Sequence, residues 1–167
     1  MRTHRTAGSP VVRTALPAEA PAVAALHARA RSTYYPDGLP DDGTDWPAGW
    51  AEAIGRTDRR VLCAVLDGRL VGIASFHLPR GAPAESVELL QFHTDPGHWG
   101  RGVGTALHRA CVEEWQADGR RTAVLSVHAG NARAQAFYAG RGWVPDLRQP
   151  PAEGDHHLLM RLTVAGE

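Results

Sequence analysis

The spacing of apolar residues changes several times along the chain, and each change marks a different expected element. Some stretches place apolar residues every three to four positions, as on one face of a helix. Between them lie compact or alternating apolar runs bounded by Gly, Pro and Asp, which are typical of strands. We therefore expect helices over residues 17–31, 46–54, 102–117 and 131–141. We expect strands over residues 11–15, 60–66, 69–78, 87–94, 122–127 and 156–164, with a further short strand near Trp143.

Turn residues separate these elements and indicate how they connect. Asp67-Gly68 lies between two apolar runs, which is the strongest local signal for a β-hairpin. Residues 34–45 are rich in Pro, Gly and Asp and are expected to form a loop. The resulting order is β-α-α-β-β-β-α-β-α-β, with no internal repeat and no linker. This order predicts one α/β domain over residues 11–167, preceded by a flexible tail over residues 1–10.

The composition narrows the class of protein. The chain has 167 residues, and its 18 basic and 18 acidic side chains give a formal net charge of zero, which argues against a nucleic-acid partner. All the basic residues are Arg, so no Lys is present to form a Schiff base. No apolar run is long enough to span a bilayer, and residues 1–10 lack the apolar core of a signal peptide. We expect a cytoplasmic protein with no membrane contact. Cys63 and Cys111 lie far apart in apolar segments and are expected to be core thiols.

The segment most informative about chemistry joins the expected strand at 87–94 to the expected helix at 102–117. Over residues 95–104 it reads Asp-Pro-Gly-His-Trp-Gly-Arg-Gly-Val-Gly. Glycines allow a tight turn and the close approach of a ligand, and the first amides of a helix have no partner within it. Together with Arg101, these amides predict a site for an anion such as the diphosphate of a cofactor.

Three kinds of phosphate-binding loop compete for this segment. A P-loop requires Lys, which the chain lacks. A dinucleotide-binding loop requires a third glycine, whose position is taken by Leu107. The third kind is the pyrophosphate loop of a coenzyme A enzyme. A nucleotide-binding oxidoreductase stays open as an alternative at this point.

The glycine segment resembles motif A of the GNAT superfamily of N-acetyltransferases, Q/R-x-x-G-x-G/A, with Gly102 and Gly104 at the glycine positions. Trp99 stands where the family pattern has Gln or Arg, but main-chain amides need no particular side chain to bind phosphate. A second segment, residues 131–143, resembles the family's N-x-x-A-x-x-F-Y-x-x-x-G-F, with Trp143 in place of Phe. The resemblance covers nearly the whole chain and implies an α/β GNAT fold, a mixed twisted sheet with helices on both faces.

This resemblance implies an N-acetyltransferase that uses acetyl-CoA as co-substrate. The acceptor is a primary amine of a small molecule or peptide, attacking directly in a ternary complex. A main-chain N–H near residues 92–94 is implied as the donor to the developing oxyanion, and Asn131 is implied to contact the pantetheine arm. The residues implied to bind the cofactor are Phe92, His93, Thr94, Trp99, Gly100, Arg101, Gly102, Val103, Gly104, Thr105, Asn131, Arg133 and Phe137.

Acetyl transfer to an amine requires an acid and a base. A primary amine is mostly protonated near neutral pH and must lose a proton before it attacks. Tyr138 matches the family's general acid, which protonates the leaving thiolate. Two residues are candidates for the base: Glu88 at the start of the strand over 87–94, and His93 nearer the expected carbonyl. Water that carries the proton to bulk solvent is the third candidate.

The acceptor pocket is expected between the first two helices, where the family places it. Tyr34, Tyr35 and Trp50 are the predicted acceptor-binding residues. Together with Trp46 and the Asp residues of the loop over 34–45, they suit an organic cation. An ordinary polar loop with Trp side chains packed beneath it explains the same residues equally well.

The sequence also bears on metal binding, on the oligomeric state and on whether the protein is an enzyme. No metal is expected, because the adjacent His156 and His157 would face opposite ways on a strand. A homodimer is an open expectation, since dimers are common in the family. A non-catalytic acyl-CoA sensor or interaction module of the same fold is the alternative to an enzyme, and Tyr138 favours the enzyme.

Overall fold

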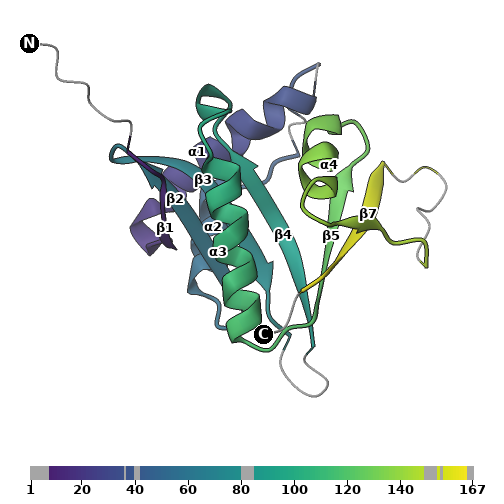
Figure 1. Cartoon of the computed structure of the whole chain (residues 1–167). Coiled ribbons are helices and arrows are strands. Elements are labelled where there is room, and N and C mark those ends of the chain that lie inside the picture. The colour runs from purple at the N-terminus through teal and green to yellow at the C-terminus, as the bar shows by residue number, and fades with distance from the viewer. Residues whose placement is uncertain are drawn as a thin grey trace, which may run out of the picture.

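A seven-stranded sheet runs through the centre of the computed structural model (Figure 1). Its strand order is β1-β2-β3-β4-β5-β7-β6, and all neighbouring strands are antiparallel except β4 and β5, which are parallel. The strands are β1 (Val11–Thr14), β2 (Arg59–Leu66), β3 (Arg69–His77), β4 (Ser86–Thr94), β5 (Thr122–His128), β6 (Val144–Pro145) and β7 (His157–Thr163). The structure describes residues 8–35, 37–39, 42–79, 85–148, 154 and 156–164. Residues 1–7 of the predicted flexible tail lie outside these ranges.

The helices confirm the predicted order of elements, with one correction. They are α1 (Ala20–Arg31), α2 (Trp46–Gly55), α3 (Val103–Ala117) and α4 (Ala132–Ala139), with short 3-10 turns η1 (Pro17–Glu19), η2 (Ser32–Tyr34) and η3 (Pro96–His98). The single helix expected over 17–31 is divided into η1 and α1. Pro21 has no N–H to donate to the Pro17 carbonyl, so the Ala20 N–H bonds to it instead, which makes a 3-10 turn.

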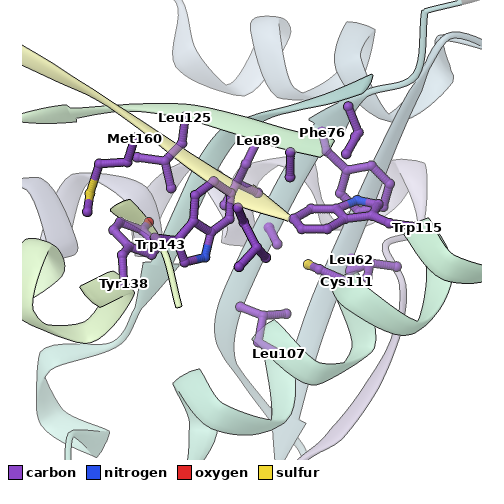
Figure 2. Close-up of a cluster of buried hydrophobic side chains, with 14 of the residues drawn as sticks. Leu62, Phe76, Leu89, Leu107, Cys111, Trp115, Leu125, Tyr138, Trp143 and Met160 are labelled. Atoms are coloured by element: carbon purple, nitrogen blue, oxygen red, sulfur yellow. The ribbon is translucent and has the colours of Figure 1, made fainter. Parts of the chain in front are cut away.

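The sheet separates two buried clusters, one on each face. Side chains of β2 and β3 alternate between them: Cys63 and Ile73 contact α1 and α2, whereas Leu62 and Ala74 pack with α3. Figure 2 shows the cluster on the α3 side, where aromatic rings from α3, α4 and the segment before β6 meet the sheet. Cys63 and Cys111 are both buried and free, so their prediction as core thiols is confirmed.

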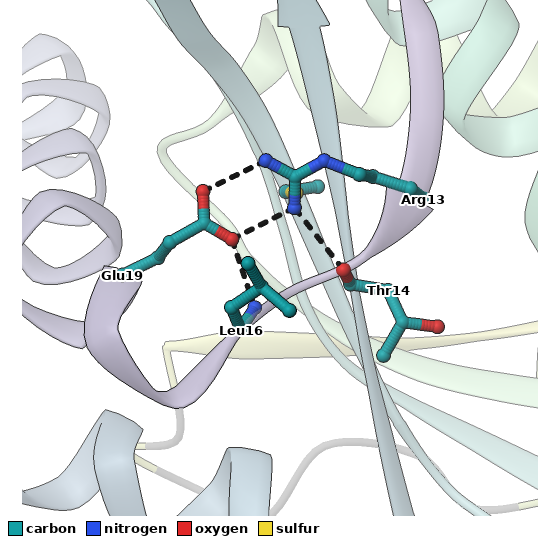
Figure 3. Close-up of polar contacts among 5 residues, drawn as sticks. Arg13, Thr14, Leu16 and Glu19 are labelled. Carbon is teal, nitrogen blue, oxygen red and sulfur yellow. Dashed lines mark hydrogen bonds and ion pairs between the residues drawn. The ribbon is translucent and has the colours of Figure 1, made fainter.

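An ion pair closes the turn between β1 and η1 (Figure 3). Both guanidinium Nη atoms of Arg13 donate to the Glu19 carboxylate, at 2.7 and 2.9 Å. The same carboxylate accepts a hydrogen bond from the Leu16 N–H at 2.8 Å. Glu19 therefore satisfies an amide at the start of η1, and Arg13 holds Glu19 in place.

The sheet is split between β4 and β5. Their pairing runs only from Ser86 opposite Thr122 to Leu89 opposite Leu125, and both strands continue beyond it. Figure 1 shows the two strands diverging towards the end where α4 lies. The split opens a space in the middle of the molecule.

An irregularity in β4 lies at the point where the split begins. Ser75 of β3 pairs with Gln91, but the next residue, Phe76, pairs with Leu89. Leu90 is therefore an extra residue in β4, which makes a β-bulge. The side chains of Leu89 and Phe92, three residues apart, pack with the same cluster on the α3 face.

Candidate active site

The turn between β4 and α3 contains two residues with a positive φ, and both are glycine. Gly100 and Gly102 both have φ of +78°, which L side chains rarely adopt. The first hydrogen bond into α3 runs from the Ala106 N–H to the Gly102 carbonyl at 3.0 Å. The amides of residues 103–105 precede this bond and are directed outward at the positive end of the helix.

Gly104 brings the start of α3 close to α4. A Cβ added at Gly104 would come 3.0 Å from Cε2 of Phe137 and 3.7 Å from Cγ2 of Thr94. A side chain there would push the Phe137 ring away. With glycine, the amides at the start of α3 line an open cleft between α3 and α4.

Two arginines lie at this cleft. Arg141 donates a hydrogen bond from Nη2 to Oγ1 of Thr105 at 2.6 Å, and its guanidinium lies 3.6 Å from the centre of the Phe137 ring. Arg133 lies 3.8 Å from the centre of the Trp99 ring. These contacts hold positive charge beside the outward-directed amides, so the site suits an anion.

The cleft at the start of α3, which we call the anion cleft, has a volume of about 230 Å³. Nearly all the predicted cofactor-binding residues line it, and Arg101 is the exception, since it is exposed and does not contribute to the lining. Phe137, which was predicted to bind cofactor, forms a wall of the cleft as well as packing against Gly104. The predicted residues that line the cleft are Phe92, His93, Thr94, Trp99, Gly100, Gly102, Val103, Gly104, Thr105, Asn131, Arg133 and Phe137.

A second cavity, also about 230 Å³, lies in the split between β4 and β5. We call it the histidine pocket, because His27, His93, His128 and His157 all line it. The two cavities share six lining residues, so they adjoin each other. The shared residues are Tyr34, Phe92, His93, Asn131, Ala134 and Tyr138.

The main chain of β4 contributes polar groups to the split. The Asp95 N–H donates to the Val71 carbonyl of β3 at 2.8 Å. Residues of an antiparallel strand bond alternately to one side and the other. His93, two residues before Asp95, therefore bonds to β3, while the amides of Phe92 and Thr94 face the split, where β5 has diverged.

Tyr138 lies at the junction of the two cavities and is nearly buried, with 6% of its surface exposed. Its ring contacts those of Phe92, Phe137 and Trp143, with ring centres 5.7 to 6.0 Å apart. Burial raises the pKa of Tyr138 well above the ordinary value for a phenol. The hydroxyl therefore keeps its proton throughout the neutral and mildly alkaline range.

Two stacked imidazoles form one wall of the histidine pocket. The ring centres of His27 and His93 are 4.6 Å apart. Burial, with the neighbouring His27 and Arg31 charges, lowers the pKa of His93 to about 3, and its Nε2 lies 2.7 Å from Oε1 of Gln91. Burial also lowers the pKa of His27 to about 4, and Nδ1 of His27 accepts a hydrogen bond from Nε1 of Trp50 at 3.3 Å. Both rings are neutral near pH 7.

The structure does not bring two predicted site residues into either cavity. Glu88, a predicted base, is exposed and lies opposite Val124, in the part of β4 that still pairs with β5. The split opens only beyond Leu89, so the Glu88 side chain lies outside it. Trp50, a predicted acceptor residue, is 4% exposed and packs beneath the pocket against His27. Tyr34 and Tyr35 do line the histidine pocket.

Sequence reasoning missed several residues that line these cavities. His27 and Arg31 reach the histidine pocket from α1, beside Trp46, which the sequence had grouped with the predicted acceptor-binding residues. Arg141 follows α4 and lies at the anion cleft. His27 and Arg31 differ by four residues and so share a helix face, which is a signal that could have found them once the face of α1 was known.

Residues 21–143 match the sequence model of the acetyltransferase (GNAT) family. The chain belongs to the GNAT family of acetyltransferases. An uncharacterized N-acetyltransferase of Mycobacterium tuberculosis is 36% identical over 113 residues, which cover 66% of this chain and 69% of that protein. The fold is similar to that of PaiA N-acetyltransferase from Thermoplasma acidophilum in complex with coenzyme A, with a TM-score of 0.76 at 16% identity, covering 93% of this chain and 99% of that one. It is also similar to that of YncA, a putative acetyltransferase from Salmonella typhimurium with its cofactor acetyl-CoA, with a TM-score of 0.71 at 20% identity and 96% of each chain covered.

The predicted GNAT fold is thus confirmed, and the chain is an acyltransferase by family. Neither the family nor the fold supports the alternative of a nucleotide-binding oxidoreductase. Within the described ranges, no helix has the length and apolar character needed to cross a bilayer. The same residues contain no group of three or more His, Cys, Asp or Glu side chains placed to hold a metal ion.

Proposed function

We propose that this GNAT protein transfers the acetyl group of acetyl-CoA to a primary amine of a small molecule or peptide, by direct attack in a ternary complex. The observation that carries the proposal is that the anion cleft adjoins the histidine pocket, with Tyr138 in the lining of both. A substrate that binds by its diphosphate at one end can then present its thioester to an amine at the other. A homodimer and a cytoplasmic location stay predictions.

The residues of the anion cleft fit the diphosphate of acetyl-CoA. Gly104 leaves the amides of residues 103–105 open to a ligand, because a Cβ there would collide with Phe137. Arg141 adds a charge beside Thr105, which replaces the role predicted for Arg101. Phosphate groups bind favourably at such a helix start. The pantetheine arm would then run past Asn131 into the split.

The amides of β4 that face the split would bind the thioester end. Acetyl-CoA supplies an activated carbonyl there. The N–H groups of Phe92 and Thr94 face the split and are the donors available to the oxyanion that forms when the amine attacks. The new N–C bond forms as the C–S bond breaks, and the thiolate requires one proton.

Tyr138 is the proposed source of that proton. Tyr138 lines both cavities, and its raised pKa keeps the hydroxyl protonated until the thiolate forms. Thiolate leaves more easily when it is protonated at once, so loss of the hydroxyl should slow turnover without weakening cofactor binding.

His93 is the proposed acceptor of the amine proton, because it lines both cavities and is neutral, whereas Glu88 lines neither. Its low pKa means that it cannot hold the proton for long and must pass it to solvent. If a His93→Gln variant keeps full turnover, the proton leaves through water alone.

The test is a release assay for coenzyme A thiol with a panel of primary amines, run beside binding of coenzyme A by calorimetry. Wild type should turn over at least one amine. Tyr138→Phe should lower kcat by about 100-fold or more while its affinity for coenzyme A stays unchanged. Tight binding of coenzyme A with no turnover on any amine would favour the non-catalytic sensor instead. An unchanged kcat in Tyr138→Phe would remove Tyr138 from the mechanism.

A further inference from the structure

The charges around the histidine pocket are unusual for a site that receives an amine. Among its described lining residues none is Asp or Glu, although a protonated amine would be attracted by a carboxylate. The charged side chain in the lining is Arg31, accompanied by the four imidazoles. The described lining of the anion cleft also contains no carboxylate. The pocket therefore repels a free cation.

Arg31 lies against two aromatic rings of the pocket lining. Its guanidinium lies 5.0 Å from the centre of the Trp46 ring and 5.5 Å from that of Tyr35. Within the described ranges it forms no ion pair, whereas Arg13, Arg56 and several others do. Its charge acts on Asp42 on one side and inside the pocket on the other, where it helps to lower the pKa of both His27 and His93.

The described carboxylates of the early loop, Asp37, Asp42 and Asp45, line neither the anion cleft nor the histidine pocket. Asp45 accepts a hydrogen bond from the Ala48 N–H at 3.0 Å and caps α2. Asp42 accepts one from the Thr44 N–H at 3.0 Å and lines a third cavity, of about 260 Å³, which also has Arg31 in its lining. Asp41 lies outside the described residues. The rings of Tyr35 and Trp46, which were expected to hold a cationic acceptor, already hold Arg31.

We propose that the acceptor of this acetyltransferase is an amine that also carries an anionic group, a carboxylate or a phosphate, and that Arg31 binds this group. The inference rests on the proposed function and names the acceptor class of the same site. A guanidinium binds either anion through paired N–H donors. With its anion on Arg31, the acceptor directs its amine towards His93 and Tyr138, and the nearby positive charge lowers the pKa of the amine, which favours the neutral form that attacks.

The experiment compares matched acceptors with the wild-type enzyme at saturating acetyl-CoA, by thiol release. One acceptor is an α-amino acid, the second its primary amide, the third the corresponding amine without the carboxylate, and the fourth the aminophosphonate. We expect kcat/KM to be at least about tenfold higher for the carboxylate or the phosphonate than for the two analogues that lack an anionic group. The better of the two anions identifies the acceptor class.

The variant test uses Arg31→Gln, with Arg109→Gln as the matched control, since Arg109 is exposed on α3 and lines neither cavity. Arg31→Gln should raise the KM of the anionic acceptor about tenfold or more. The KM of acetyl-CoA should stay unchanged, and the kcat/KM of the amine that lacks an anionic group should not fall. Equal turnover of all four acceptors, or preference for the two that lack an anionic group, overturns the inference while leaving the proposed acetyltransferase intact. Absence of turnover on every amine, with coenzyme A bound, instead refutes the proposed function. If Arg31→Gln fails to fold, the wild-type comparison alone decides.

Discussion

The anion cleft and the histidine pocket share six lining residues, yet the groups that distinguish them differ in kind. The cleft uses main-chain amides at the start of α3, and its shape depends on glycines within one short segment. The pocket uses side chains from α1, the loop before α2, β4, β5 and β7. A site made of main chain can be recognised from a local motif, whereas a site made of dispersed side chains becomes visible only when the fold brings them together.

The largest expected effect comes from a substitution at Gly104, which should damage the anion cleft and leave the histidine pocket in place. A Gly104→Val substitution places a branched side chain where even a Cβ meets Phe137 at 3.0 Å. We expect affinity for coenzyme A, measured by calorimetry, to fall by about 100-fold or more, because the amides are blocked and Phe137 is displaced. Gly49→Val is the control, since Gly49 lies in α2 and has nothing within 4 Å of its added Cβ. Normal binding by Gly104→Val would show that the diphosphate does not lie at the start of α3.

The pocket can be tested through the dependence of stability on pH. The folded-state pKa of His27 is about 4, below the ordinary value of 6.5, so its contribution to stability is present above about pH 6.5. Between pH 6.5 and 4 the unfolded state binds more protons, and the free energy of unfolding should fall, by a total on the order of 3 kcal/mol from this residue. His27→Leu should flatten that pH dependence in urea titrations. The exposed His156 provides the control, as His156→Gln should leave the slope unchanged.

A smaller effect should separate side-chain charge from main-chain amides within the cleft. Arg141→Gln removes the guanidinium beside Thr105 but leaves the amides in place. We expect the KM for acetyl-CoA to rise by roughly tenfold, about 1.4 kcal/mol, with the KM of the acceptor unchanged. Arg109→Gln again serves as the control. A rise in both KM values would mean that Arg141 acts on the packing of Phe137 and not on the cofactor.

The smallest effect is expected at the ion pair of Figure 3, which touches neither cavity. Arg13→Gln removes both hydrogen bonds to Glu19, but the pair is partly exposed, with 41% of the Arg13 side chain accessible. Such pairs contribute at most about 1 kcal/mol. We expect a slight loss in the free energy of unfolding, seen in urea titrations, and unchanged kinetics. A change in kcat would show that β1 influences the site.

The sequence predicted the anion cleft better than the histidine pocket, because only the cleft has a local motif. The hydrophobic pattern predicted every strand and helix in order, because each element buries a face with its own period. The glycine spacing predicted an anion site at the turn before α3, and the resemblance to the GNAT family implied the other residues that line the cleft; Arg101 is exposed and lies outside the lining. Glu88 and Trp50 could not be placed, since their positions depend on where β4 leaves β5 and on which face of α2 packs inward. The pairing of His27 with His93 joins residues far apart in the chain and gave no local signal.

The extra residue Leu90 determines which side chains of β4 face α3 and which face α1. Phe92 and Thr94 point to the side of α3, whereas Gln91 and His93 point to the side of α1. Without the insertion, the alternation after Leu89 would reverse, and His93 would move to the cofactor face. An insertion or deletion of one amino acid in this stretch would therefore exchange the side chains that β4 presents to the two sides of the sheet, whereas a replacement would change one side alone.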